Sequence, residues 1–334
     1  MKNIAVMCGG DSSEREISTK SALNIVQFID REKYNPYIVF IEKRFWYVMA
    51  PESLSVDAVL AHKNAPVMDK NDFSCTISGS KLCFDIAFIM IHGTPGENGL
   101  LQGYLEMMKI PFNTCSSFVS AITFDKHSCK RFLDFAGVKM AEDVFIRKDS
   151  PYSTREIIRR IGLPMFVKPT VGGSSFGVTK VKTEEELEPA LHKAFTECDT
   201  ILAEAAVKGR EMTNGIYKLN GMVHHLPVTE IITKREYFDY EAKYLGESEE
   251  VCPANISPAM SSKIQNLSER IYSYMGCNGI VRMDYIVDEK EDIYFLEVNT
   301  VPGMTKMSLV PKMLEVEGIA MKDFVTSLIE EAKY

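Results

Sequence analysis

The stretch GIVRMDYIV at residues 279–287, with its continuation IYFLEVNTVPG at residues 293–303, decides the organisation of this chain. Both segments are rich in β-branched and aromatic residues, and a polar run at 288–292 lies between them. This pattern predicts two antiparallel strands joined by a short loop.

The polar side chains of these two strands fall on one surface, because successive side chains point to opposite faces of a strand. One register joins the strands as three facing pairs: Arg282 with Asn299, Asp284 with Glu297, and Ile286 with Phe295. That register gathers two carboxylates, an amide and a guanidinium on a single face.

The two carboxylates of this surface repel each other unless a positive group lies between them. Arg282 and a metal ion are the candidates. The potential ligands are all oxygen atoms, which favours a hard cation such as Mg²⁺ over Zn²⁺. The alternative is a solvated sheet face with an Arg–Glu pair, and these residues alone leave both interpretations open.

Length and composition limit the class of protein. A chain of 334 residues is long enough for two or three domains. It has 38 Lys and Arg against 46 Asp and Glu, a net charge of −8, with no long basic run, which disfavours nucleic acid and membranes as partners. Eight scattered cysteines without a CxxC pair are typical of a reduced cytoplasmic protein. The apolar start at 4–8 is too short for a signal-peptide core and predicts a strand.

The N-terminal third predicts an α/β sheet. After the first strand, Gly9 and Gly10 precede a capping box at 13–16, which is expected to open a helix ending near Phe28. Glu14 then lies at a ligand-facing edge, although it would also suit the helix dipole. There is no GxGxxG motif, so a dinucleotide site is disfavoured.

A second candidate edge follows the apolar run at 82–91, which predicts a buried strand. His92 comes directly after this run, at the start of a glycine-rich loop before a helix near 101–108. A residue at the carboxyl end of a buried strand is well placed to contact substrate. A histidine that only caps the loop is the other interpretation.

The central region contains a candidate phosphate-binding loop. Lys168 ends an apolar strand and precedes GGSSFG at 172–177, whose backbone N–H groups and hydroxyls are suitable donors to phosphate. The order of a P-loop is absent, and a flexible hairpin turn is the alternative. Further elements are expected as strands at 37–41, 144–146, 178–181, 201–206 and 226–232 and as helices at 154–161, 184–196, 258–275 and 313–332.

Eight motifs in order give these pieces a common interpretation, because together they resemble the D-alanine–D-alanine ligases of the ATP-grasp superfamily. They are GGxSxEREIS at 9–18, HGxxGExG at 92–99, DK at 125–126, VKP…GGSSxGV at 167–178, GRE at 209–211, FDYEAKY at 238–244, RxD at 282–284 and LEVNTxPGMTxxS at 296–308.

The resemblance implies a three-domain α/β fold: an N-terminal parallel-sheet α/β domain at 1–116, followed by two α+β ATP-grasp subdomains at 117–207 and 208–334. It implies that Mg·ATP phosphorylates the carboxylate of one D-alanine and that the amine of a second attacks the D-alanyl phosphate. Two Mg²⁺ ions, replaceable by Mn²⁺, a cytoplasmic location and a role in peptidoglycan synthesis follow from it, and it leaves a homodimer open.

The resemblance also implies roles for individual residues. Asp284, Glu297 and Asn299 would bind the metal ions. The ATP-binding set would be Lys126, Lys168, Ser175, Glu204, Val207, Glu211 and Lys243. Glu14, Ser174 and Tyr244 would form a network over the nascent bond, Arg282 and Gly303 would stabilise the oxyanion, and His92, Ser308 and Leu309 would contact the two substrates.

The sequence departs from the family pattern at two places, and two other functions are alternatives to the one implied by the resemblance. Val171-Gly172 lacks the charged lid residue of many relatives, and Asn98 stands where an acid is common. A ligase that uses D-serine or D-lactate as second substrate is the first alternative, and Tyr244 argues against D-lactate. A catalytically silent nucleotide-binding protein is the second, and the retained carboxylates, arginine and lysines argue against it.

Overall fold

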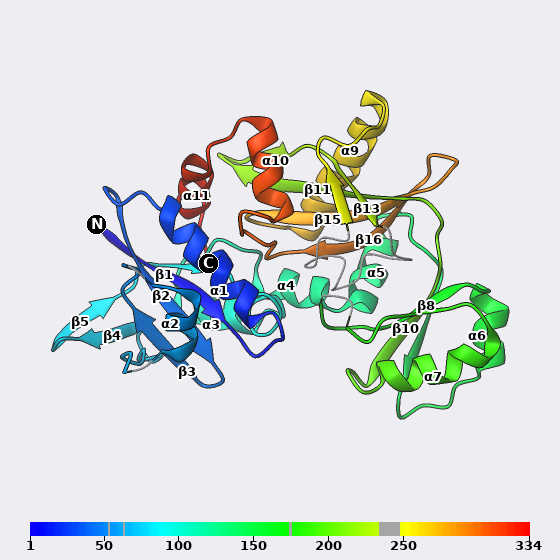
Figure 1. The fold of residues 1–334 in the computed structure, drawn as a ribbon, viewed down its shortest axis with the longest axis horizontal. Coiled ribbons are helices and arrows are strands. Elements are labelled where there is room, and N and C mark those ends of the chain that lie inside the picture. Colours follow the sequence, from blue (N-terminus) through cyan, green and yellow to red (C-terminus); the bar gives the residue numbers. More distant parts are fainter. Residues whose placement is uncertain (53, 63, 174–175, 234–247) are drawn as a thin grey trace.

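The computed structural model describes residues 1–52, 54–62, 64–173, 176–233 and 248–334. Within this part of the chain, three sheets of four or more strands follow one another in sequence order, with helices packed on them (Figure 1). None of the helices described there combines the length and the apolar character that a membrane span needs.

The first sheet has the strand order β3-β2-β1-β6, in which β1 is parallel to both of its neighbours. Alternate residues of β1 enter two different cores: Ile4 packs on one face and Ala5 on the other. Such burial on both faces is the usual environment of a parallel strand. The elements of this region are β1 Lys2–Gly9, α1 Arg15–Phe28, β2 Tyr34–Glu42, β3 Phe45–Met49, α2 Val56–Ala61, the ribbon β4 Ser74–Ile77 with β5 Ser80–Cys83, β6 Ile86–Ile89 and α3 Leu100–Met108.

The second sheet is antiparallel and has the order β7-β10-β8-β9. Its core is closed by the apolar faces of two helices, with Ile157 of α6 and Leu187 and Leu191 of α7 fully or almost fully buried. The elements that precede and form it are α4 Ser117–Phe124, α5 Lys126–Asp134, β7 Asp143–Arg147, α6 Thr154–Ile161, β8 Met165–Pro169, β9 Thr179–Val181, α7 Glu184–Ala194 and β10 Thr200–Ala205.

The third sheet has the order β14-β13-β11-β15-β16, with β12 paired to β11. Helix α9 covers one face, where Ile264 and Ile271 pack against Met283 and Tyr285 of β15. The opposite face of β15 carries the polar residues predicted above. The elements are β11 Arg210–Leu219, β12 Met222–His225, β13 Thr229–Thr233, β14 Ser248–Val251, α9 Pro258–Met275, β15 Val281–Val287, β16 Ile293–Asn299, α10 Leu309–Glu317 and α11 Met321–Glu330.

The cores cross the predicted domain boundaries. Phe324 of α11 belongs to the same core as Ile4 and Phe88 of the first sheet, and Figure 1 shows α10 and α11 above α1. Val119 of α4 and Leu133 of α5 pack in the core of the third sheet. The division at 116/117 and 207/208 therefore remains a prediction, and the chain folds back across both boundaries.

Four predicted elements differ from the structure. The run at 82–91 splits into β5 and β6, and the side chain of Asp85 between them accepts a hydrogen bond from the Asn3 N–H at 2.7 Å. The helix predicted at 313–332 is two helices, because Gly318 ends α10 in a left-handed conformation (φ 72°). The strand predicted at 226–232 starts only at Thr229, after Pro227, which cannot donate a ladder hydrogen bond.

The fourth difference is at the start of α1. The capping box predicted at 13–16 does not form, because Glu14 is the N-cap residue and its side chain makes no capping hydrogen bond. Instead, the Ser12 hydroxyl accepts a hydrogen bond from the Glu14 N–H at 3.2 Å. The Glu14 carboxylate is thus not used to close the helix end.

Candidate active site

Two adjoining cavities, each of about 190 Å³, contain most of the predicted site residues. Lys126, Gly172, Gly173 and Glu297 line both cavities and so mark where they meet. The first cavity is also lined by Glu14, His92, Arg282, Asn299, Gly303, Ser308 and Leu309. The second is also lined by Lys168, Glu204, Val207, Glu211 and Asp284.

The hairpin β15–β16 forms the floor of both cavities. Arg282 faces Asn299 and Asp284 faces Glu297, as predicted. The third predicted pair is wrong: a β-bulge after Asp284 pairs Ile286 with Tyr294 instead. The bulge moves Phe295 to the buried face beside Tyr285, so Phe295 does not share a face with Glu297.

The Arg282 guanidinium binds the Asp284 carboxylate through two hydrogen bonds, from Nε at 3.0 Å and from Nη2 at 2.9 Å. Burial alone would lower the pKa of Arg282, but Asp284 raises it above its ordinary value. The Thr213 hydroxyl of β11 donates to the same carboxylate at 2.6 Å. The Asp284 carboxylate is therefore held in a fixed position by three hydrogen bonds.

The oxygen donors on this floor suit a hard divalent cation. Asp284, Glu297 and Asn299 come from adjacent positions of two paired strands, so carboxylate and amide oxygens face the same space. The Asn299 side-chain oxygen accepts the Val301 N–H at 3.1 Å, which orients the amide. Among the described residues no group of three or more His, Cys, Asp or Glu forms a metal cluster, so a bound ion here needs further oxygen ligands beyond the two carboxylates.

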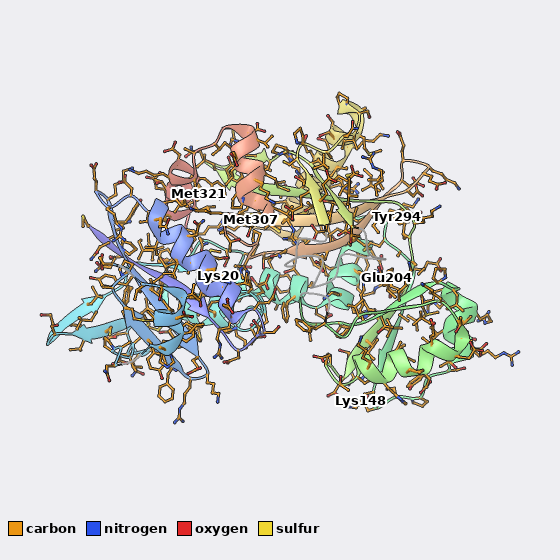
Figure 2. The ribbon with its side chains drawn as sticks, viewed as in Figure 1. Lys20, Lys148, Glu204, Tyr294, Met307 and Met321 are labelled. Atoms are coloured by element: carbon orange, nitrogen blue, oxygen red, sulfur yellow. The ribbon has the colours of Figure 1, made fainter. Side chains whose placement is uncertain are left out.

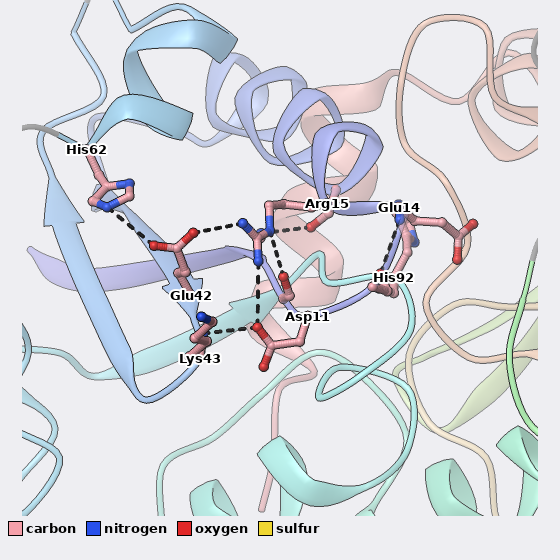
Figure 3. Close-up of polar contacts among 11 residues, drawn as sticks. Asp11, Glu14, Arg15, Glu42, Lys43, His62 and His92 are labelled. Carbon is pink, nitrogen blue, oxygen red and sulfur yellow. Dashed lines mark hydrogen bonds and ion pairs between the residues drawn. The ribbon is translucent and has the colours of Figure 1, made fainter. Parts of the chain in front are cut away.

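The turn before α1 directs two neighbouring charged side chains in different directions. Arg15 is held on one side by Glu42 at 2.8 Å and by the Gly10 carbonyl at 2.9 Å. Figure 3 shows the Glu14 carboxylate pointing away from that cluster. It reaches the glycine-rich loop, because a Cβ added at Gly173 would lie only 2.9 Å from Glu14 Oε2.

His92 is buried at the wall of the first cavity and joins it to the loop after β16. Its Nδ1 lies 2.9 Å from the Val301 carbonyl, which only accepts, so Nδ1 is the protonated nitrogen. Its Nε2 lies 3.3 Å from the Ser21 hydroxyl, which also accepts the Met304 N–H. Burial lowers the pKa of His92, although Glu14 acts against this. His92 is thus a neutral side chain that both lines the cavity and holds the loop.

The loop from β16 to α10 closes the first cavity. A Cβ added at Gly303 would lie 2.8 Å from the Ser308 hydroxyl, so only glycine fits without a shift. Ser308 is the N-cap residue of α10, and its hydroxyl contacts Thr305 rather than capping the helix. The first N–H groups of α10, starting at Leu309, therefore face the cavity end of the helix, a common binding site for carboxylates.

The second cavity lies between the second and third sheets. The Lys126 ammonium at the start of α5 donates to the Gly172 carbonyl at 2.8 Å. The Lys168 ammonium lies 2.8 Å from Glu204, which Figure 2 shows where the second sheet approaches the third. Burial alone would raise the pKa of Glu204, but Lys168 and then Lys130 lower it below its ordinary value. Val207 and Glu211 line the same space.

Four predicted site residues, Ser174, Ser175, Lys243 and Tyr244, lie outside the described residues. Two residues that support the site, Glu97 at the first cavity and Thr213 behind Asp284, had no predicted role. Glu97 lines the first cavity and accepts the Gly93 N–H at 2.6 Å; its place in the HGxxGExG motif was the available signal. Thr213 lies on β11 and contacts Asp284. Nothing in the sequence of β11 indicates that this strand pairs with the hairpin.

Asn98, one of the two departures, stabilises its own loop. Its side-chain nitrogen donates to the Thr94 hydroxyl at 3.1 Å, and its oxygen accepts the Leu100 N–H at 3.3 Å at the start of α3. An aspartate in this place would keep the second of these contacts.

This fold, with cavities meeting between its second and third sheets, is that of an ATP-grasp ligase. A family model described as D-ala D-ala ligase N-terminus matches residues 3–115, and one described as D-ala D-ala ligase C-terminus matches residues 132–330. The chain belongs to the D-alanine–D-alanine ligase family, which confirms the resemblance predicted from the eight motifs.

Individual relatives agree over almost the whole length. A D-alanine–D-alanine ligase of Bacteroides fragilis (strain YCH46) is 46% identical over 98% of both chains, and that of Flavobacterium johnsoniae is 40% identical over 99% of both. Among solved structures, D-alanyl-alanine synthetase A from Vibrio cholerae is 30% identical with a TM-score of 0.86, covering 98% of this chain and 97% of the other. A D-Ala:D-Ser ligase from Enterococcus faecalis is 28% identical with a TM-score of 0.85, covering 98% of both.

Proposed function

We propose that this protein joins two D-alanines into D-alanyl-D-alanine at the expense of ATP, through a D-alanyl phosphate, with release of ADP and phosphate. The family and the names of its relatives support this reaction. The observation that carries it is the meeting of the two cavities at Lys126 and Glu297, since phosphoryl transfer requires a nucleotide and an acceptor side by side. The reaction supplies a peptidoglycan precursor, and we place it in the cytoplasm.

The second cavity is the proposed nucleotide site. Glu204 and Val207 meet the adenine edge and Glu211 the ribose. Lys126 and Lys168 hold the ATP phosphates together with Ser175 of the glycine-rich loop at 172–177. Lys243 of the FDYEAKY motif also binds the nucleotide. Phosphoryl transfer depends mainly on positioning and charge neutralisation, for which lysines at the cavity wall are suited.

Two Mg²⁺ ions, for which Mn²⁺ is an expected substitute, are the proposed metal cofactors at Asp284, Glu297 and Asn299. When bound, they offset the repulsion between the substrate carboxylate and the triphosphate. Arg282 already orients the Asp284 carboxylate by two hydrogen bonds, so the position of this ligand is fixed before a metal binds.

The first cavity is the proposed D-alanine site. Glu14 binds the ammonium of the first D-alanine, in a network with Ser174 and Tyr244, and His92 lies beside that substrate. Arg282 and the Gly303 N–H stabilise the tetrahedral oxyanion, and Ser308 and the Leu309 N–H receive the carboxylate of the second D-alanine. The neutral His92 adds no positive charge that would compete for Glu14.

D-serine is the alternative second substrate, since one structural relative is named as a D-Ala:D-Ser ligase. D-lactate is a weaker alternative, because Tyr244 is retained. The names of the more similar relatives favour D-alanine. A homodimer remains part of the proposal.

The decisive experiment measures phosphate release from Mg·ATP with D-alanine alone, and with D-alanine plus D-serine, D-lactate or L-alanine, with product analysis of each mixture. D-alanyl-D-alanine should be the main product whenever D-alanine is present. A dominant mixed product with D-serine would assign the alternative, and absence of any D-alanine-dependent phosphate release would refute the ligase.

A further inference from the structure

The second sheet contains a buried cluster of charges under the proposed adenine site. Glu204 on β10 lies directly opposite Asp143 on the neighbouring strand β7. Two like charges in facing positions destabilise a sheet. Both residues are buried, with 5% and 7% of their surface exposed, so water does not screen the repulsion.

Lys130 of α5 lies between these two carboxylates. Its ammonium is 2.8 Å from Asp143 Oδ2 and 3.1 Å from Glu204 Oε2, and it donates to the Ala141 carbonyl at 2.8 Å. An ammonium has three donors, and these three acceptors use all of them. The Lys130 side chain is 4% exposed, so it does not reach solvent.

Lys168 has a different relation to Glu204. It pairs with the same carboxylate oxygen at 2.8 Å, but it lines the nucleotide cavity and is more exposed, at 15%. In the proposed function Lys168 turns to an ATP phosphate. Glu204 would then lose one of its two cations at the moment when it must accept a hydrogen bond from the adenine amino group.

We propose that Lys130 is a positioning residue for nucleotide selection: it keeps Glu204 ionised and oriented toward the adenine edge when Lys168 leaves for the phosphates. This inference rests on the proposed nucleotide site. Adenine offers a 6-amino donor where guanine has a carbonyl acceptor, so an ionised Glu204 accepts from the first and repels the second. A buried polar group that the wrong ligand leaves without a hydrogen-bond partner discriminates strongly between two ligands.

The test compares Lys130→Met with Asp143→Asn in the intact protein, because each removes a buried partner from the same cluster. The dissociation constants of ADP and GDP are measured by calorimetry, and thermal unfolding is followed for each variant. For Lys130→Met the preference for ADP over GDP should fall by about tenfold or more. Asp143→Asn should lower the unfolding temperature and keep the preference, because Lys130 still pairs with Glu204. An unchanged preference in Lys130→Met, or an equal loss in both variants, would overturn the proposal.

A second arm covers the case in which Lys130→Met does not fold. Glu204→Gln and the double variant Lys130→Met/Glu204→Gln leave no unpaired buried carboxylate at this position. If Lys130 acts through Glu204, the two should have the same ADP/GDP ratio, and a further fall in the double variant would contradict the proposal. Failure of the unmodified protein to bind ADP would instead refute the proposed nucleotide site itself.

Discussion

Two pairs of carboxylates face each other across neighbouring strands in this molecule, and they are stabilised in different ways. Asp284 and Glu297 face each other on the third sheet, and Asp143 and Glu204 on the second. Both pairs have the same electrostatic problem, since like charges in facing positions repel. The cation that offsets this repulsion comes from a different part of the fold in each pair.

In the third sheet the cation is Arg282, two residues from Asp284 on the same strand, and it binds that carboxylate from one side. Glu297 stays at the wall of both cavities. In the second sheet Lys130 lies between the two carboxylates and binds both. The first arrangement, here called the open pair, leaves Asp284 and Glu297 at the second cavity for a metal, and the second, the closed pair, holds Asp143 and Glu204 together through Lys130. A cation beside a facing carboxylate pair therefore leaves both members at the cavity, whereas a cation between the members leaves only Glu204 there.

The largest effect is expected for Arg282→Met, which removes the cation of the open pair. If Arg282 also meets the oxyanion, kcat should fall by about 10²–10³, with a smaller change in ATP affinity. Steady-state kinetics with D-alanine and a binding measurement with ADP separate the two effects. Arg210→Met is the control, because Arg210 makes a similar two-bond pair with Glu230 on the same sheet, and neither side chain lines the two cavities. A kcat retained in Arg282→Met would make the arginine a purely structural partner of Asp284.

Glu297→Gln should have the next largest effect, since it keeps the size of the side chain and removes one charge of the open pair. Weaker metal binding should raise the Mg²⁺ concentration required for half-maximal turnover by about 10–100-fold. Glu289→Gln, an exposed change in the turn of the same hairpin, should leave that requirement unaltered. The metal assignment fails if the two variants show the same dependence of turnover on Mg²⁺.

In the closed pair, Asp143→Asn should change stability rather than metal dependence. Lys130 and Arg131 each lose their ion pair with Asp143, while Lys130 keeps Glu204, so we expect a loss of roughly 1–2 kcal/mol in the free energy of unfolding. Urea unfolding measures this loss, and a Mg²⁺ titration of turnover should match that of the unmodified protein. A changed Mg²⁺ requirement would show that the two carboxylate pairs are energetically coupled rather than independent.

The open pair was predictable from sequence because its partners lie close together along the chain. Alternation places Arg282 and Asp284 on one face, and the apolar residues Met283 and Tyr285 hold the other face in the core, which sets the register. The prediction failed only beyond Asp284, where the bulge adds one residue to β16. The sequence IYFLEVN does not indicate which residue is the extra one, because each of its residues is either a good strand former or a polar residue of the predicted site.

The closed pair was not predictable in the same way. Lys130 lies four residues after Lys126, on the same face of a helix, but the carboxylates it binds come from positions 143 and 204. Only the antiparallel pairing of β7 with β10 brings those two together. Glu204 had a predicted role in binding ATP, whereas the need for a buried cation behind it follows from the fold.

Glu97 shows a third way of burying a carboxyl group, in which the group keeps its proton. Among the described residues no Lys or Arg forms an ion pair with Glu97, and the Gly93 N–H is its hydrogen-bond donor. Burial raises the pKa of Glu97 from 4.5 to about 8, and Glu14 adds to the effect.

The direction of the resulting pH dependence follows from these values. Below the unfolded pKa the group is protonated in both states, and its protonated form costs no stability. Between that value and about 8, the folded protein holds a proton that the unfolded chain has released, so raising the pH favours unfolding. The free energy of unfolding should therefore fall with rising pH in this window, by at most about 1.4 kcal/mol per pH unit from this group.

Glu97→Gln should remove this contribution, because an amide of the same shape has no proton to lose. Urea unfolding of both proteins at intervals from pH 5 to 8, without substrates, gives the two slopes, and the variant should have the flatter one. Glu16→Gln is the control, since Glu16 pairs with Lys20 at the surface and should leave the slope unchanged. Parallel slopes for Glu97→Gln and the unmodified protein would mean that Glu97 is ionised in the folded protein. Its negative charge would then be stabilised by solvent in the first cavity rather than removed by a retained proton.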